Sequence, residues 1–300
     1  MKKITIYILS LFIYCLELTD SVYAKPIMQT QTQSEANPEA LSTAQTNVIQ
    51  ALLDDTCRIS GVPGMSVSIR SKDEVFYFSS GYADRENGMP ASENSLYELA
   101  SVSKALTGVG VLLLEEQGLL LMNDSIQKYL PWFTLKYRGK PVDMQNVTLN
   151  HFLHHTSGLV NSRHTKDIPQ GNTPDMLRKT VETLTDAELA FMPGEKYTYG
   201  TVNYDVLGLV MEVVSGQSYE DFMAEQVFQP LGLYHTYVYK EDASAAGELA
   251  QGYRTSFFGR CPMMRRIMPE INSPATSFPA QKICRAGWVL QLYCVWSLCL

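Results

Sequence analysis

One stretch of this 300-residue chain has to be buried as a helix. Apart from Lys104, residues 101–114 are apolar or small, no proline interrupts them, and the stretch runs on to Glu115-Glu116-Gln117-Gly118. A glycine just after the last turn is a common helix stop. A helix that is apolar on nearly all sides is stable only when other layers surround it. We therefore predict a core helix inside a layered domain.

Patterns on either side of this helix predict two different kinds of structure. Residues 65–69 and 75–78 are rich in β-forming side chains and are joined by a polar segment, which indicates a hairpin. A first helix is expected before it, ending near Gly61. After the core helix, further helices are expected at 149–153, 173–189, 202–214 and 219–227. The predicted fold class is therefore α/β plus all-α: an antiparallel sheet flanked by helices, together with a helical lobe.

The composition excludes several classes of protein. Apolar residues make up 45% of the chain, which is enough for a large core. The 24 basic residues are outnumbered by 31 acidic ones, so the net charge of −7 does not indicate a basic surface that would bind a nucleic-acid partner. With 19 glycines and 14 prolines, neither a collagen-like nor a low-complexity chain fits.

The N-terminal segment has the pattern of a secretory signal. Met1-Lys2-Lys3 precedes an apolar run at 4–18 and the small-residue site Val22-Tyr23-Ala24. We expect residues 1–24 to be a signal peptide, with a retained anchor as the alternative. The run is too short for a comfortable membrane span. Residues 25–44 are polar and are expected to form a disordered tether. The expected location is secreted or extracytoplasmic, in a bacterial cell envelope.

Ser101 and Lys104 carry the candidate chemistry. In Ser-x-x-Lys, three-residue spacing puts the hydroxyl and the amine on one helix face. A lysine acts as a base only when neutral, which burial favours, and no charge lies between Lys104 and Glu115. The same pattern occurs at Ser125 and Lys128, but that lysine lies in an amphipathic stretch open to water. The context therefore favours Ser101 as the nucleophile.

Residues 97–108 resemble the nucleophile segment of the serine β-lactamase and penicillin-binding protein superfamily, especially its class C-like branch. Three later segments agree in order: His155-Thr156-Ser157-Gly158-Leu159, residues 191–216, and residues 222–236. The resemblance implies a hydrolase domain over residues 45–259, here partial, with the active site between an α/β lobe and a helical lobe. It also implies acyl transfer through an acyl-serine.

The family's second motif, Tyr-x-Asn, corresponds here to Tyr199-Gly200-Thr201. The resemblance implies that the Tyr199 hydroxyl relays a proton near Ser101. Thr201 stands where the family has an asparagine that helps to orient lysine and substrate, and a hydroxyl has fewer donors than an amide. Thr201 is therefore only a candidate for substrate binding. Asn203 is an alternative source of an amide, but we expect it to cap or pack in the following helix.

Five aromatic residues near these motifs are expected to pack rather than to contact substrate. They are Trp132, Phe133, Tyr137, Tyr197 and Tyr204.

The family's third motif, Lys-Thr-Gly or His-x-Gly, has no counterpart after Tyr199. By resemblance, its strand supplies a backbone N–H that completes the oxyanion hole with that of Ser101. The chain changes character at residue 260: its net charge is −11 before Arg260 and +4 from there on, and four of its six cysteines lie in this tail. Between the signal and the tail only Cys57 occurs, so no disulfide framework is expected.

We expect residues 260–300 to be an aberrant tail. The codons of residues 274–287 can be read in a shifted frame, in which each new codon joins the third base of one codon to the first two bases of the next. This frame permits a sequence that resembles the family's next segment. We therefore hypothesise a frameshift between Phe258 and Pro274, which would leave the family domain truncated. The terminal apolar run 287–300 is too short for a membrane span and is expected to be an exposed patch.

Two other sites compete with this assignment. His151, His154 and His155 crowd one segment, but no Asp, Glu or Cys set accompanies them as metal ligands. Structural roles in the following turn are favoured, and no metal or other cofactor is expected. Ser157 neighbours two histidines, as in a Ser-His-Asp hydrolase, but the Gly-x-Ser-x-Gly motif is missing.

The leading functional hypothesis is a secreted serine hydrolase that forms an acyl-serine intermediate. Its expected partners are cell-wall D-amino-acid peptides, β-lactams or small esters. The alternative is a catalytically inactive truncated product, or a pseudoenzyme that binds without turnover.

Overall fold

The computed structural model describes residues 41–71, 74–161, 173–253 and 291–293. All of them belong to one unit of the chain, Glu39–Leu300. The predicted signal peptide, most of the tether and most of the tail lie outside the described residues. No helix among the described residues is long and apolar enough to cross a membrane.

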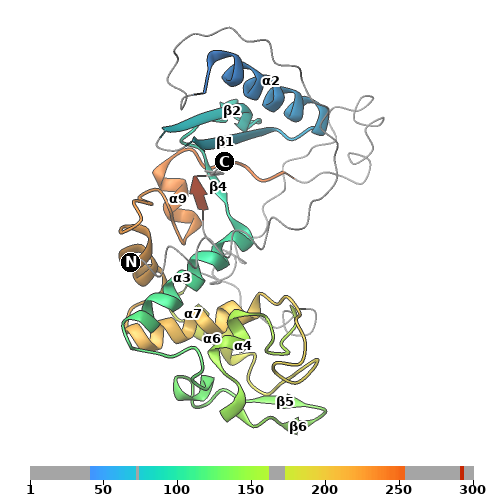
Figure 1. Ribbon diagram of the computed structural model, residues 1–300, viewed down its shortest axis with the longest axis vertical. Coiled ribbons are helices and arrows are strands. Elements are labelled where there is room, and N and C mark those ends of the chain that lie inside the picture. Colours follow the sequence, from blue (N-terminus) through green and yellow to red (C-terminus); the bar gives the residue numbers. More distant parts are fainter. Residues whose placement is uncertain (1–40, 72–73, 162–172, 254–290, 294–300) are drawn as a thin grey trace, which may run out of the picture. The chain divides into compact units, whose positions relative to one another are not determined.

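The N-terminal part is a helix on a β-hairpin. Helix α2, Thr43–Ser60, lies along strands β1, Gly64–Ser71, and β2, Glu74–Asp84 (Figure 1). The strands pair antiparallel from Gly64 with Gly81 to Ser71 with Glu74, which confirms the predicted hairpin. Strand β3, Met89–Pro90, adds a short third strand.

Helix α2 begins earlier than the sequence predicted. Residues 43 and 44 were assigned to the tether, but Ser42 forms a capping box with Gln45, and the helix starts at Thr43. The Gln45 N–H donates to Ser42 Oγ, and the Ser42 N–H donates to Gln45 Oε1. Such a cap satisfies two orphan backbone donors and so fixes the start of a helix.

The predicted core helix follows a short strand. Strand β4, Leu96–Glu98, leads into the 3-10 turn η1, Ala100–Val102, and then into α3, Ser103–Glu116. Strand β8, Gln291–Tyr293, pairs antiparallel with β4. These three residues belong to the run 287–300; the rest of that run, and the predicted exposure of the patch, lie outside the described residues.

A third small sheet lies beyond α3. Strand β5, Leu135–Tyr137, pairs with β6, Lys140–Pro141, and in parallel with β7, Ala187–Glu188. Helix α4, Leu149–Leu153, has the predicted bounds. Short 3-10 turns occur at η2, Ile126–Lys128, and η3, Met144–Asn146.

The helix predicted over 173–189 is much shorter. Helix α6 spans only Met176–Glu182, and the chain then extends into β7. The Asp186 N–H donates to the Thr134 carbonyl and the Leu189 N–H to the Lys136 carbonyl. Pairing with the β5 region therefore outweighs the local helical pattern.

The helical core is built around α7, Val202–Ser215, whose residues 202–211 are all buried. Helix α3 packs beside it, as Figure 1 shows. Helix α8, Tyr219–Phe222, continues into a π-helical turn, η4, Met223–Phe228, and α9, Lys240–Ala246, follows. Gly110 of α3 permits the close approach, since a Cβ there would lie 2.6 Å from Met211 Cε. A sheet region and a helical region are thus both present, as the predicted fold class required.

We expect Gly158→Ala to be far more destabilising than Gly118→Ala. Both glycines have left-handed backbone conformations, with φ of 85° and 73°. A Cβ at Gly158 would lie 2.2 Å from the Phe191 carbonyl oxygen, whereas at Gly118 nothing lies within 4 Å. Strain alone costs about 1–2 kcal/mol at Gly118, and the added clash raises the cost to about 3–4 kcal/mol at Gly158. Urea unfolding measures both, and equal losses would contradict the packing described here.

Candidate active site

Ser101 is presented to solvent by a strained turn. Ala100, the residue before it, has a φ of 48°, which side chains with a Cβ rarely adopt. The turn η1 then carries Ser101 at the start of α3, where the residue is exposed. Such strain persists only where the surrounding structure enforces it, and it is concentrated at functional sites.

Lys104 lies one helical turn beyond Ser101 and is buried, with 5% of its surface exposed. Its Nζ lies 3.4 Å from Ser101 Oγ and donates a hydrogen bond to it. The same Nζ lies 5.0 Å from the centre of the Tyr199 ring and 5.8 Å from that of Tyr204. Aromatic faces attract a cation, so these rings compensate part of the cost of burying the ammonium. The predicted dry setting of Lys104 is confirmed.

Tyr199 completes a group of three with Ser101 and Lys104. Its hydroxyl donates to Ser101 Oγ at 2.7 Å, across 98 residues of sequence. Burial raises the pKa of Tyr199, but its hydrogen bonds with Lys104 and Ser101 and the charge of Lys104 outweigh burial and leave the pKa below the ordinary value. The hydroxyl is therefore easier to deprotonate than that of a free tyrosine.

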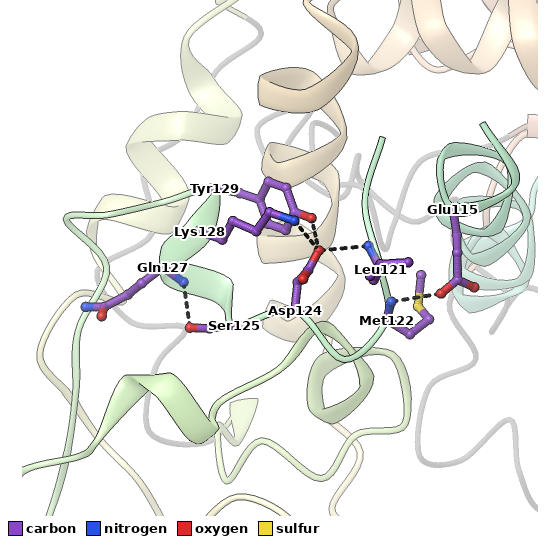
Figure 2. Close-up of polar contacts among 8 residues, drawn as sticks. All are labelled: Glu115, Leu121, Met122, Asp124, Ser125, Gln127, Lys128 and Tyr129. Atoms are coloured by element: carbon purple, nitrogen blue, oxygen red, sulfur yellow. Dashed lines mark hydrogen bonds and ion pairs between the residues drawn. The ribbon is translucent and has the colours of Figure 1, made fainter. Parts of the chain in front are cut away.

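The second Ser-x-x-Lys sequence forms no such group. Figure 2 shows Lys128 Nζ donating to Asp124 at 2.7 Å, and Asp124 also accepts from the Tyr129 hydroxyl and the Leu121 N–H. The hydrogen bond to Asp124 raises the pKa of Lys128. Ser125 donates to the Met144 carbonyl and caps the turn η2 by accepting from the Gln127 N–H. This serine and lysine are structural, as the sequence context predicted.

Thr201 is placed differently from the other three candidates. It is buried, with 1% of its surface exposed, and its N–H donates to Asn161 Oδ1 at 2.7 Å. Asn161 Nδ2 lies 3.4 Å from Thr201 Oγ1. The sequence analysis missed Asn161, whose only signal was its place just after the His155–Leu159 segment. The structure therefore brings Ser101, Lys104 and Tyr199 together, and it gives Thr201 a side-chain amide as its neighbour.

The turn after α4 is fixed by buried polar contacts. Ser157 is fully buried and donates to Asn203 Oδ1 at 2.5 Å, so it is not presented as a nucleophile. Asn203 also donates to the Gly200 carbonyl at 3.0 Å, which agrees with the expected structural role.

The three histidines of this segment have separate partners. His151 Nδ1 contacts Thr148, His154 Nδ1 contacts the Asn150 carbonyl, and His155 Nδ1 faces the Gly200 N–H. Among the described residues, no three His, Cys, Asp or Glu side chains are grouped so that they could hold a metal ion.

The aromatic residues divide into two classes. Phe133 is fully buried, Tyr204 is 8% exposed, and Trp132 and Tyr137 pack against the core, as expected. Tyr197 is different, because 66% of its surface is exposed. The prediction that it packs is met only in part: Tyr197 lies in the irregular segment before α7, and its ring makes an edge-to-face contact with His155.

Comparison with known proteins shows the family to which the chain belongs. The family described as Beta-lactamase matches residues 46–263. Protein flp of Staphylococcus aureus (strain MW2) is 30% identical over 225 residues, 75% of this chain and 43% of that protein. Penicillin-binding protein 4* of Bacillus subtilis (strain 168) is 35% identical over 189 residues, 60% of this chain and 39% of that protein. The chain spans less than half of the length of these relatives.

A solved class C beta-lactamase in complex with cefoxitin has the same fold. It superimposes with a TM-score of 0.65 and 21% identity over 82% of this chain and 61% of that one. The family match covers most of the chain and contains Ser101, Lys104 and Tyr199. This chain therefore belongs to the beta-lactamase family, with the beta-lactamase/transpeptidase-like fold.

Proposed function

We propose that this chain carries the acyl-transfer centre of a serine hydrolase. The observation that carries the proposal is the position of Ser101 Oγ, which lies within hydrogen-bond distance of both Lys104 Nζ and the Tyr199 hydroxyl. A serine hydroxyl is a weak nucleophile until an adjacent group takes its proton. Two such groups converge on this one, and one of them is a tyrosine with a lowered pKa.

The proposed reaction has two stages. Ser101 Oγ attacks the carbonyl carbon of the substrate, and its proton passes to Tyr199 or Lys104, whichever is unprotonated. The tetrahedral intermediate collapses as the same pair returns the proton to the leaving group, which leaves an ester on Ser101. Water then attacks that ester, gives up a proton to the pair, and releases the acid while Ser101 is protonated again.

The substrate class and the location are parts of the proposal. We propose D-amino-acid peptides of cell-wall type, β-lactams or small esters as acyl donors. Support comes from the names of the relatives, which refer to penicillin binding in one case and to a complex with cefoxitin in another. The signal-like pattern of residues 1–24 supports secretion, and the change in composition at residue 260 supports a frameshifted tail.

A non-catalytic product is the second candidate. One sequence observation favours it: neither Lys-Thr-Gly nor His-x-Gly follows Tyr199. Such a chain would hold the Ser101 group but would not acylate it. Covalent labelling separates the two candidates.

We expect a fluorescent β-lactam or fluorophosphonate to label the folded chain on Ser101. Ser101→Ala should abolish the label, because the nucleophilic oxygen is gone. Ser125→Ala is the matched control and should label like the unmodified chain. Gel fluorescence and peptide mass spectrometry locate the adduct. Absence of an adduct on the folded chain would defeat the enzyme proposal, and labelling of Ser101→Ala would defeat the assignment of the nucleophile.

The rate of labelling should rise with pH. The unprotonated form of Tyr199 accepts the serine proton, and its lowered pKa places the apparent midpoint below the ordinary tyrosine value of about 10. Tyr199→Phe should slow labelling by about 100-fold, the usual contribution of a proton-transfer group. Single-turnover rates between pH 6 and 10 measure both effects. A rate that is flat or falls as the pH rises would contradict the proposed role of Tyr199.

A further inference from the structure

His155 holds the backbone on both sides of Tyr199. Its carbonyl oxygen accepts from the Thr198 N–H at 2.9 Å, and its Nδ1 accepts from the Gly200 N–H at 3.3 Å. The two bonds reach the residues immediately before and after Tyr199. His155 itself has a φ of 57° and is buried, with 8% of its surface exposed. The turn after α4 therefore has an enforced conformation that faces the Tyr199 segment.

The ring of His155 also supports the ring of Tyr199. Their centres lie 4.6 Å apart, in a tilted arrangement. The His155 ring packs in the same way on buried Tyr204, at 5.2 Å. Tyr199 thus has the His155 ring as one neighbour and the Lys104 ammonium as another, while its hydroxyl reaches Ser101. A shift of the His155 ring would move the phenol that donates to Ser101.

The surroundings of His155 keep its ring neutral. Burial, together with the positive charge of Lys104 from α3, lowers the pKa of His155 to about 4. The other titratable groups that face it are His154 from its own turn and three phenols, those of Tyr197, Tyr199 and Tyr204. A neutral ring leaves Nδ1 as an acceptor for the Gly200 N–H, which a protonated ring would repel. Near neutral pH the bond to Gly200 is therefore intact.

We propose that His155 is a positioning residue, which holds the Tyr199 hydroxyl at Ser101 through its ring contact and its bond to the Gly200 N–H. It touches neither Ser101 nor the substrate carbonyl in this role and acts through Tyr199. The inference rests on the proposed function of Tyr199 in proton transfer.

Two substitutions separate the contributions of His155. His155→Asn keeps an acceptor the same number of bonds from Cα and suits a positive φ, but it removes the ring. His155→Phe keeps an aromatic ring and removes the acceptor. His154→Phe is the matched control, because His154 is the exposed neighbour in the same turn.

The test is a double-mutant cycle with Tyr199→Phe, read as the rate of Ser101 acylation by a fluorophosphonate. His155→Phe should slow acylation about tenfold or more when Tyr199 is present, because the segment loses its acceptor. In the Tyr199→Phe background the same change should have less than about a twofold effect, since the group it positions is gone. His155→Asn should retain part of the rate, and His154→Phe all of it. Equal losses in both backgrounds, or no loss in either, would overturn the proposal.

A second measurement needs no activity. In protein carrying ¹³C-labelled tyrosine, the Tyr199 resonance is identified by its disappearance in Tyr199→Phe, and its pH titration is followed by NMR. His155→Phe should shift the midpoint upward, because Tyr199 then lies less firmly against Lys104. An unchanged midpoint would overturn the role of His155. Failure of the unmodified chain to react with the fluorophosphonate would instead count against the proposed function.

Discussion

The structure depends on the buried ammonium of Lys104. A charge in a core is costly unless polar and aromatic groups surround it. Among the contacts that compensate it are Ser101 Oγ and the faces of Tyr199 and Tyr204. Ser101 lies in the strained turn after Ala100, and the two tyrosines lie at the entry into α7. Burying one lysine therefore ties the start of α3 to the start of α7.

The packing beneath the site also holds the start of α3 close to the start of α7. Gly110 lets α7 and the π-helical turn approach α3 closely. Gly200 lies so near the Leu159 carbonyl that a Cβ there would be 2.8 Å from the oxygen, and Gly158 is more tightly confined, because a Cβ there would be 2.2 Å from the Phe191 carbonyl oxygen. The turn 155–161 and the segment 198–201 therefore lie side by side, joined by bonds from the Thr198 and Gly200 N–H groups to His155 and from the Thr201 N–H to Asn161. The close packing of these two backbone segments therefore fixes the position of Tyr199 as much as the contacts of its own side chain do.

Much of this was predictable from the sequence, because the relevant signals are local. The β-hairpin followed from β-forming runs on both sides of a polar turn, and the core helix from an apolar stretch with a glycine stop. Spacing and charge together distinguished Lys104 from Lys128, whose neighbour Asp124 keeps it paired at the surface. The family resemblance added Tyr199, which lies 98 residues from Ser101 and has no local signal linking the two.

What could not be predicted depends on contacts distant in sequence. The end of α6 is set by pairing with β5 rather than by its own residues. The start of α2 is the exception, because its capping box joins Ser42 and Gln45, which are only three residues apart in a polar stretch. The contact of Asn161 with Thr201 and the exposure of Tyr197 require knowledge of the turn after α4. Neither follows from periodicity or composition.

The reactivity proposed for Ser101 depends on the buried amine of Lys104. The most direct measurement compares Lys104→Met with Lys128→Met by the rate at which a β-lactam or fluorophosphonate adds its mass to the intact protein. Methionine keeps the length of the side chain and removes the amine. The account predicts that acylation slows by at least about 100-fold in Lys104→Met and changes by less than about twofold in Lys128→Met. Equal rates in the two folded variants would contradict it.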